Sequence, residues 1–227
     1  MSQDLKQKLV TANRVLANEG ITQGTGHVSV REPGAEELYI SVSRSPQFVT
    51  EEDIIRMDFD GNVLSRDDAH PYKETVIHRA IYRNRDDVNA VVHHHAPAVI
   101  PFSATDVELK PIVHFAPFRG SVPVFDEFEP EWGRMIVSES EGERMVASLG
   151  DRRAQLIAGH GGNVTGSSIE EALLATFGLV LNAQFQLQAE LLGTPRFLTD
   201  EGADAYVTVG PIDRLWEYLR RRLPGNQ

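Results

Sequence analysis

The longest periodic segment of the chain, residues 169–192, constrains the fold more than any other feature. Apolar side chains recur at helical spacing from Ala172 to Leu192. Ser167 and Glu170 stand before this run at the spacing of a capping box, in which two side chains satisfy the first free N–H groups of a helix. The sequence therefore predicts one long helix here, and any fold of the chain must accommodate it.

Four further segments have features of helices. Their apolar residues are spaced by three or four, and several are bounded by Pro at the start or Gly at the end. The expected helices cover residues 5–16 before Gly20, residues 71–84 opened by Pro71, residues 140–149 closed by Gly150, and a last segment that Gly210 and Pro211 open and that carries Leu215, Trp216, Leu219 and Leu223.

Seven segments have the β-branched residues, alternation or short apolar runs of strands. Residues 60–62 are of the types that favour turns, and they lie between the predicted strand 54–58 and Val63. This predicts a hairpin there. The predicted strands are residues 27–31, 37–43, 54–58, 88–95, 112–115, 122–125 and 155–160.

The chain contains no cysteine, which narrows the chemistry available to it. Disulfides, thiolate ligands and cysteine nucleophiles are excluded, so a metal ion would have nitrogen and oxygen ligands. The net charge of −11 repels polyanions. Nucleic acid is therefore not an expected partner, and an anionic substrate would need a local group of cations.

Neither a transmembrane helix nor a signal peptide is predicted. No run of 18 apolar residues occurs, and the first residues lack the basic and then apolar order of a signal peptide. We expect a soluble, cytoplasmic protein. The 227 residues suffice for one sizeable core, and no repeat or long linker divides them, so one domain over residues 1–227 is expected.

Three consecutive histidines occupy residues 93–95 of a predicted strand. Because side chains alternate along a strand, His93 and His95 should share one face and His94 the other. His160 ends another apolar segment, precedes two glycines, and is a candidate third ligand. Three imidazoles with open positions are typical of a catalytic metal site. On spacing alone, a His-x-His pair is more often two ordinary polar residues.

Glu74 is expected in the first turn of the helix before the histidine strand, with His78 four residues later on the same face. This position makes it a candidate acid or base beside the histidines. The alternative is a solvated carboxylate that interacts favourably with the helix dipole.

The order of these motifs resembles the class II aldolase/adducin family over roughly residues 5–192. The resemblance rests on residues 24–31 (GTGHVSVR), 39–45, Glu74, 90–95 (AVVHHH) and 159–161 (GHG). It implies an α/β fold with a central, largely antiparallel sheet and helices on both faces. Members of the family commonly form ring-like tetramers with sites at subunit borders, which implies a homo-oligomer. Trp216 and Tyr218 are candidates to pack on a neighbouring subunit.

The resemblance also implies a catalytic divalent metal bound by His93, His95 and His160, with Glu74 as the catalytic acid or base. Zn²⁺ or Mn²⁺ is the first expectation, and Co²⁺ or Fe²⁺ is acceptable, since histidine accepts several divalent ions. Adducin-like members have lost such ligands and are structural proteins. All four residues are present here, so a metal-dependent lyase is expected.

Several positions depart from the family's sugar-phosphate aldolases, which hold a phosphate with a Gly-Asn-Val-Ser loop, a Ser-Gly pair and two serines before the glutamate. Here the corresponding residues are His27, then Ser43 and Arg44, then Tyr72 and Lys73. These larger, mostly cationic groups suit a carboxylate, which Arg can hold through two hydrogen bonds. Lys also binds phosphate, and ordinary surface charge is the plain alternative for both cations.

Residues 82–102 and 114–119 most resemble the decarboxylase branch, which acts on hydroxylated aromatic or pyridine dicarboxylates and on carboxylated muconic semialdehydes such as HCOMODA. A decarboxylase in aromatic-compound catabolism is the preferred prediction, and an aldolase acting on a small oxo-compound or sugar phosphate is the alternative. Both reactions leave negative charge that a divalent cation stabilises. His114 and Arg119 are candidate substrate ligands from a loop, an ordinary core histidine and a surface arginine being the alternatives.

Overall fold

The computed structural model describes residues 1–65, 68–199 and 212–225. Its strands are β1 (His27–Val30), β2 (Glu37–Ser41), β3 (Ile54–Asp58), β4 (Ala90–His94), β5 (Val124–Phe125), β6 (Ala154–Ile157) and β7 (Gly161–Gly166). Its α-helices are α1 (Gln3–Asn18), α2 (Thr75–Asn84), α3 (Ile100–Ser103), α4 (Glu139–Leu149), α5 (Ile169–Leu192) and α8 (Ile212–Arg221). Short 3-10 helices cover Pro46–Phe48, Glu51–Asp53 and Pro130–Trp132.

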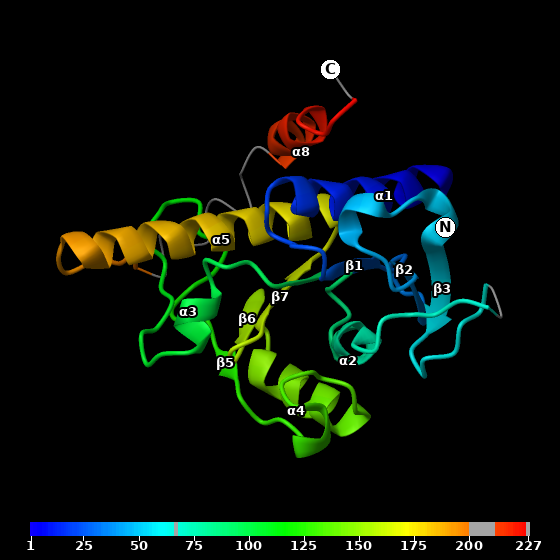
Figure 1. Ribbon diagram of the computed structural model, residues 1–227, viewed down its shortest axis with the longest axis horizontal. Coiled ribbons are helices and arrows are strands. Elements are labelled where there is room, and N and C mark those ends of the chain that lie inside the picture. Colours follow the sequence, from blue (N-terminus) through cyan, green and yellow to red (C-terminus); the bar gives the residue numbers. More distant parts are fainter. Residues whose placement is uncertain (66–67, 200–211, 226–227) are drawn as a thin grey trace.

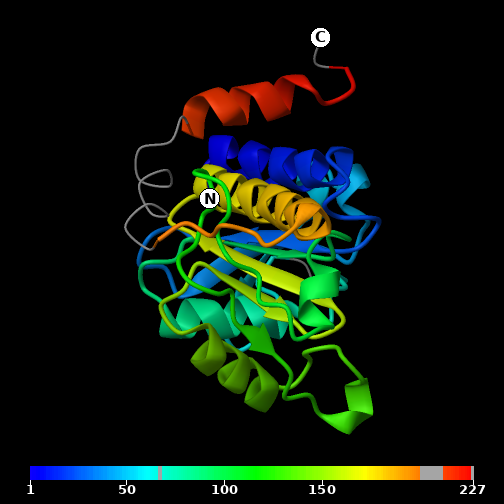
Figure 2. The ribbon, with the colours of Figure 1, turned by 90° about the vertical axis from the view of Figure 1, so that its left-hand side faces the viewer.

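The described strands form one sheet of seven in the order β3-β2-β1-β4-β7-β6-β5 (Figure 1). Neighbouring strands are antiparallel except β5 and β6, which are parallel. Helices α1 and α5 cover one face with α8 outside them, and α2 and α4 cover the other face (Figure 2). The prediction of a largely antiparallel sheet between helices is confirmed.

Alternation along the central strands divides the core into two layers. Val28 and Val92 lie in the apolar cluster under α1 and α5. Val91 lies in the cluster under α2 and α4. Because side chains two residues apart share a face, His27 and His93 point to the side of α2 and α4, and His94 points to the opposite side.

The predicted helices are largely confirmed. Helix α5 ends at Leu192 as predicted, and its N-cap is Ser168, whose Oγ accepts the Glu171 N–H, one residue later than the predicted capping box. Helix α4 ends before Gly150, which has a φ of 58°. The predicted opening of the last helix at Gly210 and Pro211 lies outside the described residues. In that helix Leu219 is buried and Trp216 packs on the core of its own chain.

Helix α2 begins later than predicted. Residues 73 and 74 form a turn before the helix, with the Thr75 N–H donating to the Tyr72 carbonyl and the Ile77 N–H to the Glu74 carbonyl. Glu74 is thus the N-cap residue of α2 and not part of its first turn. At this position the Glu74 side chain is buried and makes no capping hydrogen bond to α2.

One strand prediction was wrong, and another is confirmed only in part. Residues 112–115 form no strand, because the N–H groups of Ile112 and Val113 donate to the Asn182 side chain of α5 instead of to a neighbouring strand. Of residues 122–125 only Val124 and Phe125 pair. β1, β2 and β4 are shorter than predicted, β3 has the predicted bounds, and the hairpin is confirmed by a bridge between Met57 and Val63.

The predicted strand 155–160 is in fact the first strand of a hairpin. β6 ends at Ile157, and after three residues β7 begins at Gly161. β7 escaped prediction because glycines are poor strand formers. Gly161 is required by close packing, since a Cβ there would lie 2.1 Å from the His94 carbonyl oxygen. His160 is therefore held in a tight hairpin connection.

Within the described parts of the chain, no helix combines the length and the apolar character that crossing a bilayer requires.

Candidate metal centre

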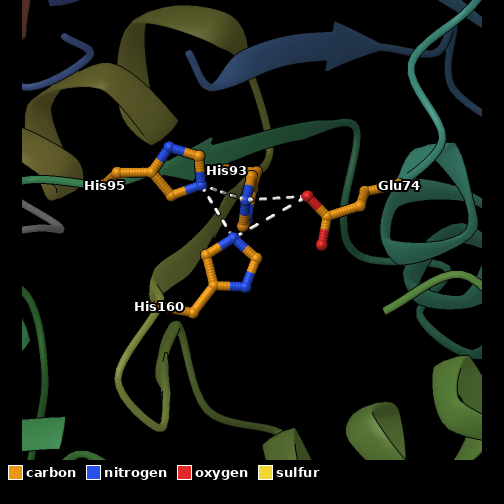
Figure 3. A group of neighbouring side chains, drawn as sticks. All are labelled: Glu74, His93, His95 and His160. Atoms are coloured by element: carbon orange, nitrogen blue, oxygen red, sulfur yellow. Dashed lines mark hydrogen bonds and ion pairs between the residues drawn. The ribbon is translucent and has the colours of Figure 1, made fainter. Parts of the chain in front are cut away.

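Four side chains from three parts of the chain converge on the α2 side of the sheet (Figure 3). His93 lies in β4, His95 directly follows that strand, His160 lies between β6 and β7, and Glu74 caps α2. The Nε2 atom of His95 is 3.0 Å from Nε2 of His93 and 2.9 Å from Nε2 of His160. The Glu74 Oε2 atom is 3.9 Å and 3.7 Å from the Nε2 atoms of His93 and His160.

The opposite nitrogen of each histidine is held by a different group. The Nδ1 atom of His93 is 2.8 Å from Asn163 Oδ1, and that of His95 is 2.7 Å from Thr25 Oγ1. The His160 Nδ1 atom is 2.7 Å from the Arg134 carbonyl oxygen, to which it donates. Such outer contacts orient ligating imidazoles and leave the Nε2 lone pairs to face inward.

This donor set fits a divalent cation. Zinc bonds of about 2.0 to 2.1 Å in tetrahedral geometry place nitrogen ligands roughly 3.3 Å apart, close to the separations here. Burial, and then the neighbouring histidines, lower the pKa of His93 well below its ordinary value, and burial and His160 lower that of His95 to about 4. Neutral imidazoles whose lone pairs face one another at this distance repel, and a shared cation removes the repulsion.

The register of the sheet places part of this centre in a row. His27 pairs with His93 across β1 and β4, and His93 pairs with Asn163 across β4 and β7. The three side chains therefore lie side by side on three adjacent strands. His94, as predicted, is on the other face, where its Nδ1 atom accepts the Ala96 N–H at 3.3 Å.

Glu74 is buried, with 7% of its surface exposed, so it is not the solvated helix-end carboxylate that was the alternative. Its Oε1 atom accepts the Ile136 N–H at 3.0 Å, and its Oε2 atom faces the histidines. Burial raises the pKa of Glu74, while His160 and the Ile136 N–H partly oppose that rise. A carboxyl group in this setting can exchange a proton nearer to neutral pH than a free glutamate.

We expect Asn163→Leu to weaken metal binding by about tenfold to a hundredfold, because losing an outer hydrogen bond to a ligating histidine typically has that effect. The measurement is a competition titration with a metal-binding dye. Asn62→Leu, at an exposed turn position away from the centre, is the control. An unchanged affinity in the Asn163 variant would show that this contact does not orient His93.

Several predicted substrate residues gather beside the centre. The His27 ring lies 4.9 Å from the His93 ring and 4.4 Å from the Tyr72 ring, measured between centroids. The Tyr72 hydroxyl donates to the Arg44 carbonyl at 2.5 Å and accepts the Arg44 N–H at 3.3 Å. Tyr72 thus joins the segment of Ser43 and Arg44 to the wall of the site.

Arg44 and Lys73, the two cationic side chains of this group, each interact with another side chain. Arg44 is exposed, and its Nη1 atom lies 3.0 Å from Asp53 Oδ1. Lys73 is exposed, and its Nζ atom lies 5.2 Å from the centre of the Trp132 ring. Both retain hydrogen-bond donors for an anion, because each guanidinium has five N–H groups and each ammonium three.

His114 and Arg119 are not brought to the four-residue cluster within one chain. His114 is exposed and contacts the Phe115 ring, and the Phe115 carbonyl lies against Gly178 of α5, on the other side of the sheet. Arg119 lines a cavity with Asp151 and Arg152, before the start of β6, whereas His160 follows its end. Their substrate role stays a prediction.

Sequence reasoning missed the residues that hold the ligands in place. Thr25, Arg134 and Asn163 contact the three histidines, and Ile136 binds Glu74 through its backbone. Two of these contacts are made by backbone groups, which have no side-chain signature. Asn163 was detectable only once β7 was known to pair with β4, since its register then places it opposite His93.

A model of the class II aldolase and adducin N-terminal domain matches residues 7–187 of the sequence. The chain belongs to this family. Its class II aldolase fold is shared with a solved aldolase II superfamily protein from Pseudomonas syringae, with a TM-score of 0.82, 27% identity and coverage of 98% of this chain and 94% of that one.

Family members with known reactions include both decarboxylases and aldolases. The chain is 29% identical to 3,4-dihydroxyphthalate decarboxylase of Arthrobacter keyseri over 83% of this chain and 79% of that one. It is 28% identical to 5-deoxy-D-ribulose 1-phosphate aldolase of Bacillus thuringiensis over 86% of this chain and 90% of that one. These class II aldolase relatives are lyases, the family is dependent on divalent metals, and the cluster of Glu74 and three histidines fits such a site.

Proposed function

We propose that this protein is a divalent-metal-dependent decarboxylase of a hydroxylated aromatic or muconate-type carboxylic acid. The observation that carries the proposal is the row of rings beside the metal centre, in which His27 packs on both His93 and Tyr72. Flat rings with few small hydroxyl groups suit a planar, carboxylate-bearing substrate better than the phosphate of a sugar.

His93, His95 and His160 would hold the cation, with Zn²⁺ or Mn²⁺ the proposed ions. When bound, such a cation supplies Lewis-acid stabilisation of the charge that builds on the substrate as the carbon–carbon bond breaks. Glu74 lies within 3.9 Å of two of these ligands and is held by the Ile136 N–H. We assign it the delivery of a proton to the carbon that loses carbon dioxide.

The proposed substrate-binding residues fall into two groups. His27, Ser43, Arg44, Tyr72 and Lys73 come from the loops and strand beside the centre, where Arg44 and Lys73 would bind a carboxylate. His114 and Arg119 would act only in a neighbouring subunit's site, which is consistent with a ring-like tetramer. We also propose that residues 1–227 form one domain.

An aldolase is the second candidate, and two observations favour it. The identity to the aldolase relative, 28%, is close to the 29% to the decarboxylase, and Lys73 beside Glu74 is a possible phosphate ligand. An aldolase would use the same four residues to cleave a hydroxylated oxo-compound into two carbonyl products.

Product analysis separates the two reactions. The metal-loaded protein is incubated with 3,4-dihydroxyphthalate, with a panel of hydroxylated aromatic and muconic carboxylates, and with 5-deoxy-D-ribulose 1-phosphate. Release of carbon dioxide from a carboxylate of the panel, with little cleavage of the sugar phosphate, is the expected result. Efficient retro-aldol cleavage with no carbon dioxide from any acid would make the aldolase the correct assignment.

We expect Arg44→Ala to raise KM about tenfold to a hundredfold, because a charge-assisted hydrogen bond to a carboxylate contributes roughly 1.5 to 3 kcal/mol. Steady-state kinetics on the acid that is decarboxylated gives the measurement. Arg56→Ala is the matched control, since Arg56 is about equally exposed and pairs with Glu37. A KM that does not change would leave Arg44 as an ordinary surface cation paired with Asp53.

A further inference from the structure

A chain of four buried polar side chains runs from the metal centre into the layer between the sheet and α2. The His27 Nδ1 atom is 2.6 Å from His78 Nε2, and His78 Nδ1 is 2.6 Å from Ser29 Oγ. Ser29 Oγ is in turn 2.8 Å from the Tyr82 hydroxyl. At most 3% of any of these residues is exposed, so the contacts form without competing water.

His78, the middle histidine of this chain, is neutral, because burial, with a smaller effect from Arg79, lowers its pKa to about 3. His27 is neutral as well when its Nδ1 atom accepts the hydrogen of His78 Nε2, 2.6 Å away. A neutral imidazole has a hydrogen on one nitrogen and a lone pair on the other. Each histidine therefore has two possible hydrogen positions, and the hydrogen bonds must select between them.

The inner end of the chain makes this selection. Burial raises the pKa of Tyr82, which keeps its proton, and among the described residues Ser29 Oγ is the acceptor within hydrogen-bond distance of that hydroxyl. The backbone N–H of Val91 donates to the same oxygen, and an N–H group cannot accept the hydroxyl hydrogen. Because a buried donor without an acceptor is strongly unfavourable, Tyr82 donates to Ser29.

The remaining directions follow from one another. Ser29 has one proton, and the other polar atom near its Oγ is His78 Nδ1, so Ser29 donates to His78. His78 then has its hydrogen on Nε2 and donates it to His27 Nδ1. His27 must have its own hydrogen on Nε2. Reversing any bond would leave the hydroxyl hydrogen of Tyr82 or Ser29 without an acceptor.

The Nε2 atom of His27 is the end of the chain that faces the site. This atom makes no hydrogen bond to another described residue. The described polar atoms that are both fully buried and without a partner do not include it, so it reaches solvent. The ring lies against His93 and Tyr72, so that solvent is beside the metal centre.

We propose that Tyr82, Ser29 and His78 are positioning residues that fix the hydrogen of His27 on Nε2, so that His27 donates a hydrogen bond to an anionic oxygen of the substrate. The substrate part of this inference rests on the proposed function, whereas the hydrogen positions do not. A fixed donor selects for a carboxylate or phosphate oxygen at this place and rejects a group that is itself a donor.

Neutron diffraction from crystals of the deuterated, metal-loaded protein tests the hydrogen positions directly. We expect deuterium on Nε2 of both His27 and His78 and none on their Nδ1 atoms. Deuterium on Nδ1 of His27 would overturn the proposal, whether or not the enzyme releases carbon dioxide. In Ser29→Ala, which removes the hydroxyl that donates to His78 Nδ1, we expect deuterium divided between the two nitrogens of His27, and full occupancy of Nε2 would show that the chain does not fix it. Tyr39→Phe, a buried hydroxyl bound to Glu37, should leave the pattern unchanged.

Calorimetric titration of the same metal-loaded proteins with phthalate and with inorganic phosphate tests the substrate part. His27→Leu should weaken binding of the preferred anion about tenfold or more, because it removes the donor. Ser29→Ala should weaken it about twofold, because only the fraction with hydrogen on Nε2 binds. Equal affinities in wild type and His27→Leu would overturn the substrate part. Tighter binding of phthalate would identify a carboxylate as the anion. Tighter binding of phosphate would support His27 as a hydrogen-bond donor, but it would contradict the proposal that the protein is a decarboxylase.

Discussion

Glu74→Gln is expected to lower the turnover rate by about a hundredfold to ten-thousandfold, the usual loss when a general acid or base is removed. The amide has nearly the shape of the carboxyl group and can still contact the Ile136 N–H, but it cannot exchange a proton. Burial of the native carboxyl raises its pKa, which suits proton delivery. The measurement combines kcat with metal content and substrate affinity, both of which should stay close to wild type.

The control for this variant is Glu143→Gln, which changes an exposed carboxylate near Arg83. It should leave kcat unchanged. If Glu74→Gln also turned over at a near-normal rate, Glu74 would have only a structural role, holding residue 136 against the start of α2.

His160→Ala is expected to deplete the bound metal and abolish turnover while the protein stays folded. The side chain contributes one of three inward-facing nitrogens, and it lies in the connection between β6 and β7, where its removal leaves both strands paired. His93→Ala and His95→Ala should have the same effect. Elemental analysis after dialysis, with circular dichroism to confirm folding, makes the measurement.

His94→Ala is the matched control, because it removes an adjacent histidine whose ring lies on the opposite face of the sheet. It should keep its metal, although the cavity left by a buried imidazole lowers the free energy of unfolding. Full metal occupancy in His160→Ala would refute the assignment of the ligands.

Elements with strong local signals were predictable from the sequence. Helix α5 has sustained apolar periodicity, and the alternation of His93 and His95 against His94 follows from the period of a strand. The exact start of α2 was not predictable, because Pro71 fits a turn as well as a first helical position. The strand β7 was missed because its glycines, which pack closely against β4, β6 and α5, give no strand signal.

The supporting contacts of the site depend on long-range pairing. Asn163 meets His93 across 70 residues of sequence, and Ser29 meets Tyr82 across 53. No local pattern identifies such partners. His78 illustrates the limit, since its spacing from Glu74 predicted only a shared helix face, whereas its ring hydrogen-bonds to His27 of β1.

The in-register row of His27, His93 and Asn163 has a consequence for how new activities arise in such proteins. These residues are anchored by paired strands, whereas Arg44, Tyr72 and Lys73 lie on loops that no strand pairing holds. Insertions or exchanges in those loops can alter which molecule is accepted without moving the histidines. Under the proposed function, the metal ligand His93 lies in the paired strands and the carboxylate-binding Arg44 and Lys73 lie in the loops, so that evolution or engineering can modify the loops while preserving the metal centre.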